Sequence, residues 1–281
     1  MTTLFVDQLT VIDCAFLDVG RGLVGESWIV DIELDGELDA QSMVLDFGEV
    51  KRQLKRAIDG SADHALLVPR LAPELQVLED GDELHLVFNA DIGAIEHRSP
   101  QVAVCLIDAA EIDAGTVAAW LQPRLQALLP PSVTALRLRL RHERIDGAFY
   151  HYVHGLKKHR GACQRIAHGH RSRIEIEVDG ARDGDLELQV ARRWLDIYLG
   201  SREDIVARGN GRICFAYTAP EGHYQLALPE THVDLLDSDS TVECIAEHLA
   251  RELSAERSGK VRVRAFEGVM KGAVAWGSAR N

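Results

Sequence analysis

The second half of this 281-residue chain repeats the first, and this repeat constrains the fold more than any other feature. The segment IELDGELD (Ile32–Asp39) recurs as IEVDGARD (Ile176–Asp183), 144 residues later. Without a gap, the same offset extends back to Phe5 and Phe149. A period this long exceeds that of solenoid repeats. It predicts a duplicated domain, with one copy over residues 1–146 and the other over residues 147–281.

Each half is expected to hold two strands, a helix, a further strand, a second helix and a last strand. In the first half, Val24–Leu34 and Ala135–His142 alternate apolar and polar residues, as half-buried strands do. Apolar residues at helical spacing predict a helix over Glu49–Ile58, and Ala114–Leu129 reads as a helix with a break at Pro123. This order predicts an α+β fold, in which each domain is an antiparallel sheet with two helices on one face.

Four further segments complete the expected elements. Short strands are predicted at Met43–Phe47 and at Leu84–Phe88. The stretch Leu199–Leu236 is poorly periodic, so we expect loops there and one strand near Ile213–Tyr217. The sequence Ser240-Thr241-Val242-Glu243 fits a capping box and predicts the start of the last helix.

Composition excludes several classes of protein. The formal net charge of −13 argues against general binding to nucleic acids or to acidic membranes, so an anionic ligand must meet a local basic patch. The five cysteines form no CxxC pair, and the N-terminus shows neither a basic segment nor a long apolar one. No apolar run approaches the length of a membrane span. These features predict a reduced cytoplasmic protein without structural disulfides.

Three histidines form the most informative pattern in the chain. His168 and His170 lie two residues apart at the start of a predicted strand, so their side chains point to the same side. His154 lies in the preceding strand and becomes a third ligand if the two strands pair as a hairpin. Three nitrogen ligands with one open position are typical of catalytic zinc. The alternative is a histidine-rich surface loop, for which an isolated His-Gly-His is a common sequence.

The repeat helps to decide between a metal site and a histidine-rich surface loop. By the 144-residue offset, the first half carries other residues at the three histidine positions. These are Thr10, Val24 and Glu26. Histidines that only fill a core would more often be lost one at a time. The joint absence therefore favours the three histidines as one unit that only the second half keeps.

The loop between these strands carries further candidates. Cys163 lies beside the histidines, and a thiol near a metal and basic groups ionises readily, so its thiolate can act as a base or a nucleophile. The alternative is an inert, buried cysteine. Four basic residues crowd the same loop and suggest a polyanionic substrate such as a phosphate chain, unless they are an ordinary solvated surface. These are Lys157, Lys158, Arg160 and Arg165.

The order of these residues resembles the 6-pyruvoyltetrahydropterin synthase and 6-carboxytetrahydropterin synthase family, which has the tunnelling fold (T-fold). The resemblance rests on an aromatic residue four positions before His154, on Cys163 shortly before His168-Gly-His170, on Thr241-x-Glu243 and on a late strand that ends in Glu267. The first half matches elsewhere. Its matching residues are Met43-Val44-Leu45-Asp46-Phe47, then a helix, then Asp63-His64. The resemblance covers most of the chain as two tandem T-fold copies.

The resemblance implies a role for each residue. His154, His168 and His170 would bind zinc, and Cys163 would be the proton-transferring base. An Asp63-His64 pair would assist it, as a relay supplied by the half that lacks the metal ligands. The substrate would be held by a pterin-anchoring carboxylate and by neighbouring polar and basic groups. The candidates are Glu267, Glu143 (which the repeat places at the equivalent position), Thr241, Lys157, Lys158, Arg160 and Arg165.

The implied activity is that of a zinc-dependent lyase acting on 7,8-dihydroneopterin triphosphate. The expected product is 6-carboxy-5,6,7,8-tetrahydropterin, on the route to deazapurine nucleosides such as queuosine. Alternative products are 6-pyruvoyltetrahydropterin and 6-hydroxymethyldihydropterin. Two further alternatives are a non-catalytic pterin- or purine-binding protein and a purely structural metal site. The family also implies a homo-oligomer, with no nucleic acid and no membrane as partner.

Overall fold

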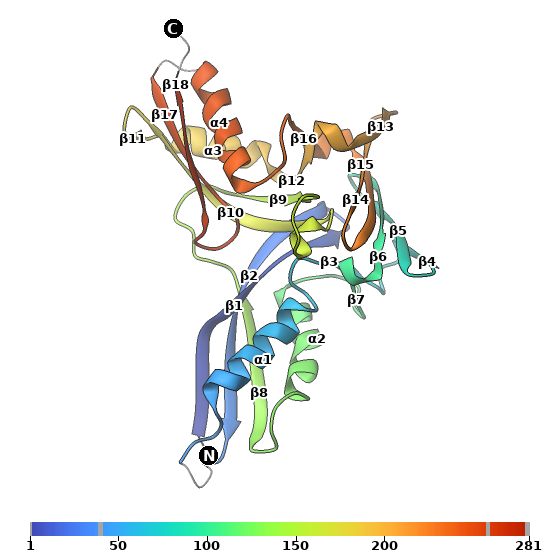
Figure 1. Cartoon of the computed structure of the whole chain (residues 1–281), viewed down its shortest axis with the longest axis vertical. Coiled ribbons are helices and arrows are strands. Elements are labelled where there is room, and N and C mark those ends of the chain that lie inside the picture. Colours follow the sequence, from blue (N-terminus) through green and yellow to red (C-terminus); the bar gives the residue numbers. More distant parts are fainter. Residues whose placement is uncertain (1, 39–41, 257–258, 279–281) are drawn as a thin grey trace.

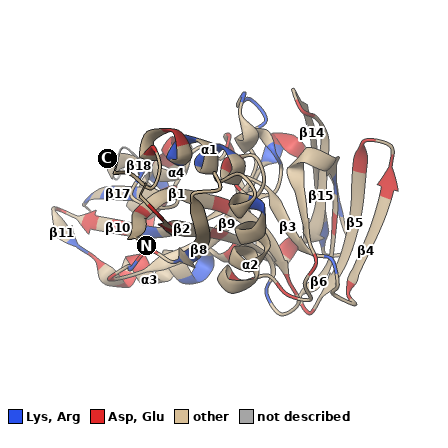
Figure 2. Cartoon of the chain, turned by 90° about the horizontal axis from the view of Figure 1, so that it is seen from below, with Lys and Arg blue, Asp and Glu red and all other residues tan. Residues whose placement is uncertain are grey.

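The computed structural model describes residues 2–38, 42–256 and 259–278, so Asp39 at the end of the first repeat motif lies outside the described residues. Two sheets each carry helices on one face, and a third sheet stands beside them (Figure 1, Figure 2). No described helix is long and apolar enough to cross a membrane. The helices are α1 (Phe47–Asp59), α2 (Ala114–Gln126), α3 (Gly184–Arg193) and α4 (Val242–Glu256). The short 3-10 helices are η1 (Gln101–Ala103), η2 (Ala162–Gln164), η3 (Arg202–Asp204) and η4 (Glu230–His232).

The first sheet has the strand order β7-β3-β1-β2-β8. Its strands are β1 (Thr2–Asp18), β2 (Gly22–Gly36), β3 (Leu66–Pro69), β7 (Val104–Ile107) and β8 (Val133–Arg141). Helices α1 and α2 cover one face and bury their apolar stripes against β1, β2 and β8 (Figure 1). The stripe of α1 consists of Val50, Leu54 and Ile58, as its helical spacing predicted.

The second sheet has the order β16-β12-β9-β10-β17-β18, with a short strand β11 against β10. Its strands are β9 (Phe149–His154), β10 (His168–Val178), β11 (Ala181–Arg182), β12 (Leu195–Ser201), β16 (Val233–Leu236), β17 (Lys260–Phe266) and β18 (Gly272–Ser278). Helices α3 and α4 cover one face and share a core with β9, β10 and β17. Apart from β11 and β18, each strand has a counterpart at the same place in the first sheet.

This shared order confirms the α+β class and two helices on one face of each sheet. The prediction of purely antiparallel sheets is wrong, because β3 and β7 run parallel to their neighbours, as do β12 and β16. Each of these strands is joined to its parallel neighbour in the sheet by a long connection and not by a tight turn. Such connections let a strand return in the same direction as its neighbour.

The third sheet joins the two halves and has the order β13-β14-β15-β6-β5-β4. Its strands are β4 (Leu75–Asp80), β5 (Glu83–Ala90), β6 (Gly93–Pro100), β13 (Ile205–Gly209), β14 (Arg212–Ala219) and β15 (Gly222–Pro229). Each half supplies three strands, and β6 pairs with β15 at the seam. The strand expected at Leu84–Phe88 is confirmed as part of β5. The strand expected near Ile213–Tyr217 is confirmed as part of β14. The loops expected over the rest of Leu199–Leu236 are wrong, since that stretch also holds β13, β15, β16 and the end of β12.

The starts of helices α1 and α4 test two further predictions. The short strand predicted at Met43–Phe47 is wrong, because Asp46 instead caps α1 and accepts hydrogen bonds from Gly48 N and Glu49 N. The predicted start of α4 is confirmed. Thr241 Oγ1 accepts a hydrogen bond from Cys244 N at 3.4 Å, and the helix begins at the next residue, Val242.

The two helix-covered sheets approach most closely at a pair of equivalent glycines, Gly25 in β2 and Gly169 in β10. A Cβ added at Gly25 would lie 1.9 Å from the carbonyl oxygen of Tyr152. One added at Gly169 would lie 2.6 Å from the Cα of Gly25. Only glycine allows backbones to come this close. The contact therefore fixes how the first half sits on the second.

Strand register corrects the predicted equivalence of His154. In the first half Phe16 pairs with Val24, and in the second half His154 pairs with His168. Since Val24 and His168 are equivalent, the counterpart of His154 is Phe16, and the match to Thr10 is wrong. The reason is that a short turn joins β1 to β2, whereas a long loop joins β9 to β10. One constant offset therefore cannot hold on both sides of that connection.

Register also corrects the counterpart of Glu267. The pairing of β8 with β2 and of β17 with β10 makes Leu138 equivalent to Val263. Counted onward from this pair, the counterpart of Glu267 is His142. The prediction that Glu143 holds that position is therefore wrong by one residue.

Candidate metal centre

The three histidines meet at one point inside the molecule. His154 on β9 pairs directly with His168 on β10, and His170 follows two residues later on the same face. All three are at most 1% exposed. The Nε2 atoms of His154 and His170 are 3.2 Å apart, and one ring nitrogen from each histidine lies within 4.8 Å of the others. In a tetrahedral zinc site with Zn–N bonds of 2.0–2.1 Å, ligand nitrogens are about 3.3 Å apart. The cluster is close to that size.

Backbone carbonyls orient two of the rings. His154 Nδ1 lies 2.8 Å from the carbonyl oxygen of Ser240, and His168 Nδ1 lies 3.0 Å from that of Arg165. A ring whose Nδ1–H donates to an oxygen presents a bare Nε2 on its other side. These two rings are therefore held as neutral ligands with Nε2 directed into the cluster.

The third ring is held by a carboxylate. His170 Nδ1 lies 3.2 Å from Asp13 Oδ1, in the first half of the chain. Asp13 also accepts a hydrogen bond from Ser27 Oγ at 2.5 Å and lies 3.2 Å from Lys271 Nζ. Burial alone would raise the pKa of Asp13, but the neighbouring His170, the ammonium of Lys271 and the hydrogen bond from Ser27 lower it well below its usual value. Asp13 is therefore an anion at neutral pH.

These residues fit a zinc ion. His168 Nε2 is buried and has no hydrogen-bond partner among the described residues, which is costly unless a ligand completes it. Burial, together with neighbouring imidazoles, lowers the pKa of His154 and of His168 well below the ordinary value. Both are therefore neutral, as metal-binding histidines must be. Three imidazoles are also a donor set that suits zinc.

A thiol and an imidazole from different halves stand beside the cluster. One ligand atom from each of His64, Cys163 and His168 lies within 4.8 Å of the others. Asp63 Oδ2 accepts from His64 Nδ1 at 2.7 Å. Burial lowers the pKa of His64, but the hydrogen bonds to Asp63 and Cys163 and their charges outweigh it and raise the pKa to about 10. The structure thus brings the predicted base and the predicted relay together, within a single chain.

The basic loop is less free than the sequence suggested. Three of its four cations are engaged by carboxylates, and Arg160 is exposed. The ion pairs are Lys157 with Asp204 and Glu203, Lys158 with Asp239 and Glu203, and Arg165 with Glu221. Arg165 also donates to the carbonyl oxygen of His64 at 3.4 Å. These pairs neutralise much of the positive charge that was expected to meet a phosphate chain.

The remaining predicted residues fall in different places. Glu267 lies 3.9 Å from Lys271, whose ammonium also contacts Asp13, so it is near the metal centre. The hydroxyl of Thr241 caps α4. Glu143 is turned toward Arg173 at 3.3 Å, and its carbonyl accepts from Arg171. The structure therefore associates Glu267, and not Glu143, with the histidine cluster.

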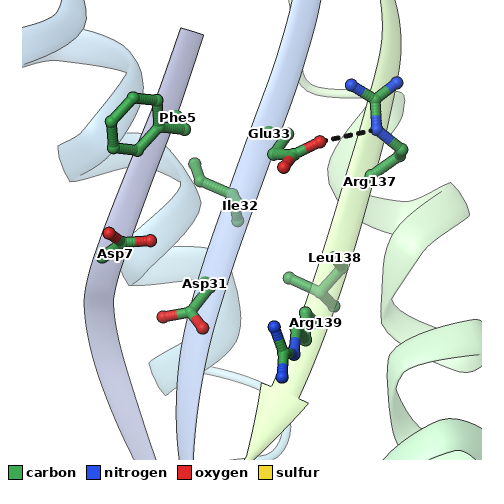
Figure 3. Close-up of a pocket in the computed structure, with 8 residues that line it drawn as sticks. All are labelled: Phe5, Asp7, Asp31, Ile32, Glu33, Arg137, Leu138 and Arg139. Carbon is green, nitrogen blue, oxygen red and sulfur yellow. Dashed lines mark hydrogen bonds and ion pairs between the residues drawn. The ribbon is translucent and has the colours of Figure 1, made fainter.

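Two cavities of about 300 Å³ lie elsewhere in the molecule. One is on the face of the first sheet that α1 and α2 leave uncovered, where Glu33 pairs with Arg137 (Figure 3). The second lies around Glu26, the counterpart of His170, and is lined in part by Phe16 and Trp28. Neither lining contains a metal-ligand candidate, Cys163 or His64.

Sequence reasoning missed Asp13, Ser240 and Lys271. A signal existed for Asp13, which is a charged residue within the apolar run Val11–Leu17 and is only 3% exposed in the fold. A buried charge in such a run usually has a specific partner. Ser240 acts through its backbone carbonyl, which no sequence motif records. Lys271 reaches the site only because the β17–β18 turn folds back over it.

Comparison with known proteins finds one family that matches the first half of the chain. The family model described as 6-pyruvoyl tetrahydropterin synthase matches residues 21–152, a segment that includes Asp63 and His64 and ends before His154. A search of curated proteins found no match.

Solved structures of the same enzyme show distant similarity. A catalytic-residue mutant of Plasmodium vivax 6-pyruvoyltetrahydropterin synthase is 18% identical, with a TM-score of 0.42, and the alignment covers 50% of this chain and 90% of that chain. The corresponding enzyme of Plasmodium falciparum is 13% identical, with a TM-score of 0.39 and coverage of 50% and 98%. The family-model match shows that residues 21–152, just under half of the chain, are similar to the 6-pyruvoyl tetrahydropterin synthase family.

Proposed function

We propose that this protein is a zinc-dependent lyase that converts 7,8-dihydroneopterin triphosphate and water to 6-carboxy-5,6,7,8-tetrahydropterin, with release of triphosphate and of the other two side-chain carbons as acetaldehyde. The observation that carries the proposal is the convergence of two groups on His168. One is the imidazole triad of His154, His168 and His170, and the other is the thiol–imidazole pair of Cys163 and His64. A metal-binding protein without catalysis would need only the triad.

In the proposed reaction Cys163 is the base. It would remove a proton from the substrate side chain, while His64, held by Asp63, is cationic at neutral pH. A thiolate and an imidazolium in contact stabilise each other, so the pair is suited to moving a proton at neutral pH. Bound zinc would orient the side-chain hydroxyls of the substrate and make them more acidic.

Substrate binding is proposed at the edge of the same cluster. Glu267, which lies 3.9 Å from Lys271, would accept hydrogen bonds from the amide and amino groups of a pterin ring. Arg160 is the loop cation most available for a phosphate chain, because Lys157, Lys158 and Arg165 already have carboxylate partners. Thr241 and Glu143 are weaker candidates on their contacts. We assign them no part in the reaction.

We further propose that residues 1–146 and 147–281 are tandem T-fold domains that share one active site. The equal strand orders of the two helix-covered sheets support this, as does the contact of Asp63-His64 with the second half. Homo-oligomeric assembly and a cytoplasmic location complete the proposal. Size-exclusion chromatography with light scattering tests the assembly, and cell fractionation tests the location.

The decisive experiment identifies the product. The purified protein is analysed for zinc and is then incubated with 7,8-dihydroneopterin triphosphate in the absence of oxygen. The masses of the products are measured by mass spectrometry. Zinc at one ion per chain and the mass of 6-carboxytetrahydropterin are expected. The mass of 6-pyruvoyltetrahydropterin or 6-hydroxymethyldihydropterin would correct the product. Tight pterin binding without turnover would replace the lyase by a binding protein, and unfolding on zinc removal would indicate a structural site.

A further inference from the structure

Asp13 lies at the junction of the two halves. It is on β1 in the first half, yet its carboxylate is 3% exposed and faces a histidine of the second half. Oδ1 lies 3.2 Å from His170 Nδ1 and accepts a hydrogen bond from Ser27 Oγ at 2.5 Å. Oδ2 lies 3.2 Å from Lys271 Nζ. Three partners therefore fix the orientation of this carboxylate.

The backbone of the same residue holds the relay pair. Asp13 N donates to Asp63 Oδ1 at 2.8 Å, and the Asp13 carbonyl accepts from His64 N at 2.6 Å. His64 has a φ of 53°, in the left-handed region that costs energy for a residue with a side chain. These two bonds help to hold that conformation, and with it the direction of the His64 ring.

Asp13 also differs from the groups that hold the other two rings. His154 and His168 face neutral backbone carbonyls, whereas His170 faces a carboxylate. The 3.2 Å contact is an ion pair and not a well-aligned hydrogen bond. A negative charge this close still favours the tautomer with its proton on Nδ1 and makes Nε2 a stronger donor to a metal. The first half of the chain, which carries none of the three candidate ligands, therefore influences how strongly one of them can bind a metal.

A second pair of a carboxylate and an imidazole lies between the two halves, with the two side chains exchanged. His151 is the counterpart of Asp13, and Glu26 is the counterpart of His170. Their side chains lie 3.9 Å apart, so carboxylate and imidazole have exchanged strands. Glu26, however, belongs to no group of described residues able to hold a metal. This second pair is a useful control, because it places a carboxylate near an imidazole, at a longer distance and without the histidine triad.

We propose that Asp13 is a positioning residue that sets the orientation and tautomer of His170 and ties this ligand to the Asp63-His64 relay. The inference rests on the proposed function, since it takes His170 as a metal ligand. It predicts that the first half contributes to metal affinity without supplying a ligand. Loss of the carboxylate should weaken zinc binding as well as turnover.

The test measures zinc affinity in the full-length protein by competition with a chromophoric chelator. We expect Asp13→Ala to weaken zinc binding by about 10- to 100-fold, as loss of an outer partner of a metal-bound histidine does. Asp13→Asn keeps an acceptor oxygen but not the charge, so it should lose less. Glu26→Gln, the matched change in the reversed pair, should leave zinc affinity unchanged.

Cobalt substitution supplies a readout that simple destabilisation would not move. The visible absorption of the Co²⁺-loaded protein should shift in Asp13→Asn and stay unchanged in Glu26→Gln. Wild-type zinc affinity and an unshifted Co²⁺ spectrum in Asp13→Asn would overturn the inference and leave the proposed function intact. Failure of the unsubstituted protein to bind either metal would instead overturn the proposed function. If Asp13→Ala does not fold, the isosteric Asp13→Asn decides alone.

Discussion

The two halves of the molecule place different chemistry at equivalent points of one architecture. At the three ligand positions the second half has imidazoles that point into a common space. The first half has Phe16, Val24 and Glu26. Two of these, Phe16 and Val24, are apolar and buried and offer no atom that could bind a metal. The difference shows that equivalent sheet positions direct their side chains to the same place. The chemical identity of those side chains then determines whether the place is packed or can bind a metal.

At the position of His64, the two halves likewise share a backbone conformation but differ in their side chains. Register of β3 on β1 and of β12 on β9 makes Asp196 the counterpart of His64. Both have a left-handed backbone, with φ of 56° and 53°. Asp196, however, accepts two hydrogen bonds from Arg21, at 2.9 and 2.6 Å. The backbone conformation is thus common to both halves, while an ion pair replaces the catalytic-type imidazole.

The largest contrast is expected between His168 and its counterpart Val24. His168→Ala removes one of three ligands and should weaken zinc binding by more than about 100-fold, beyond the loss typical of an outer partner. Turnover should be abolished. Val24→Ala should lower the free energy of unfolding by about 1–3 kcal/mol through lost packing and leave zinc affinity unchanged. Zinc analysis and urea denaturation of both variants check this. Equal zinc loss in the two would contradict the assignment of the metal to one half.

The second contrast is between the relay and its counterpart. Cys163→Ala and His64→Ala should each lower kcat by about 10²- to 10⁴-fold, the usual range for general acid–base groups, with zinc retained. Asp196→Asn should leave kcat unchanged. Single-turnover kinetics on the zinc-loaded variants measures the effect. If His64→Ala turns over normally while His168→Ala is inactive, the two halves do not share a site.

The third contrast concerns the glycine contact between the sheets. Gly25→Ala would place a Cβ 1.9 Å from the Tyr152 carbonyl oxygen, which is backbone and cannot rotate away. Overpacking of this kind typically costs about 1–3 kcal/mol. Gly184→Ala, where a Cβ meets nothing within 4 Å, should change stability little. Urea denaturation of both variants measures the difference, and equal stability would mean that the halves can shift apart without cost.

The smallest contrast is between His97 in β6 and Leu226, its partner in β15 across the seam. Burial, with the charge of His85, lowers the pKa of His97 to about 3, so it stays neutral in the folded protein. Below pH 6.5 the unfolded chain binds a proton that the folded chain does not. The free energy of unfolding should therefore fall as pH falls, by about 1.4 kcal/mol per pH unit between 6.5 and 3 from this residue alone.

His97→Leu removes this dependence. It should stabilise the protein by about 2 kcal/mol more at pH 5 than at pH 7.5, because the unfolded variant takes up no proton at this position. Urea denaturation at the two pH values gives the difference. Leu226→His is the matched control and should destabilise the protein, more so at pH 5. A pH dependence equal to that of the unsubstituted protein would show that His97 is not held neutral.

Much of this could be predicted from single residues and spacings. The placement of His168 and His170 on one face followed from alternation, because residues two apart on a strand point to the same side of the sheet. Helix α1 followed from Val50, Leu54 and Ile58, whose spacing matches a helical turn. These predictions succeeded because each depends on neighbours along the chain.

Predictions that depended on distant partners did less well. The strand expected at Met43–Phe47 ignored Asp46, whose side chain caps the following helix. In the third sheet the strands at Leu84–Phe88 and Ile213–Tyr217 were predicted, but β4, β6, β13 and β15 were not. The pairing of β6 with β15 joins residues from the two halves, which a local sequence pattern does not record. The ion pairs of Lys157, Lys158 and Arg165 join residues far apart in sequence, so the loop looked more basic than it is.

From the sequence alone it could be predicted that the chain repeats one arrangement of strands and helices, that His168 and His170 lie on one face of a strand, and that Cys163 lies close to them in the chain. Local periodicity and repetition carry that information. Only the tertiary structure decided that Asp13 orients His170 and that His64 reaches Cys163. Those contacts depend on how closely the two sheets approach at Gly25 and Gly169, and a backbone approach of that kind is a property of the packed molecule.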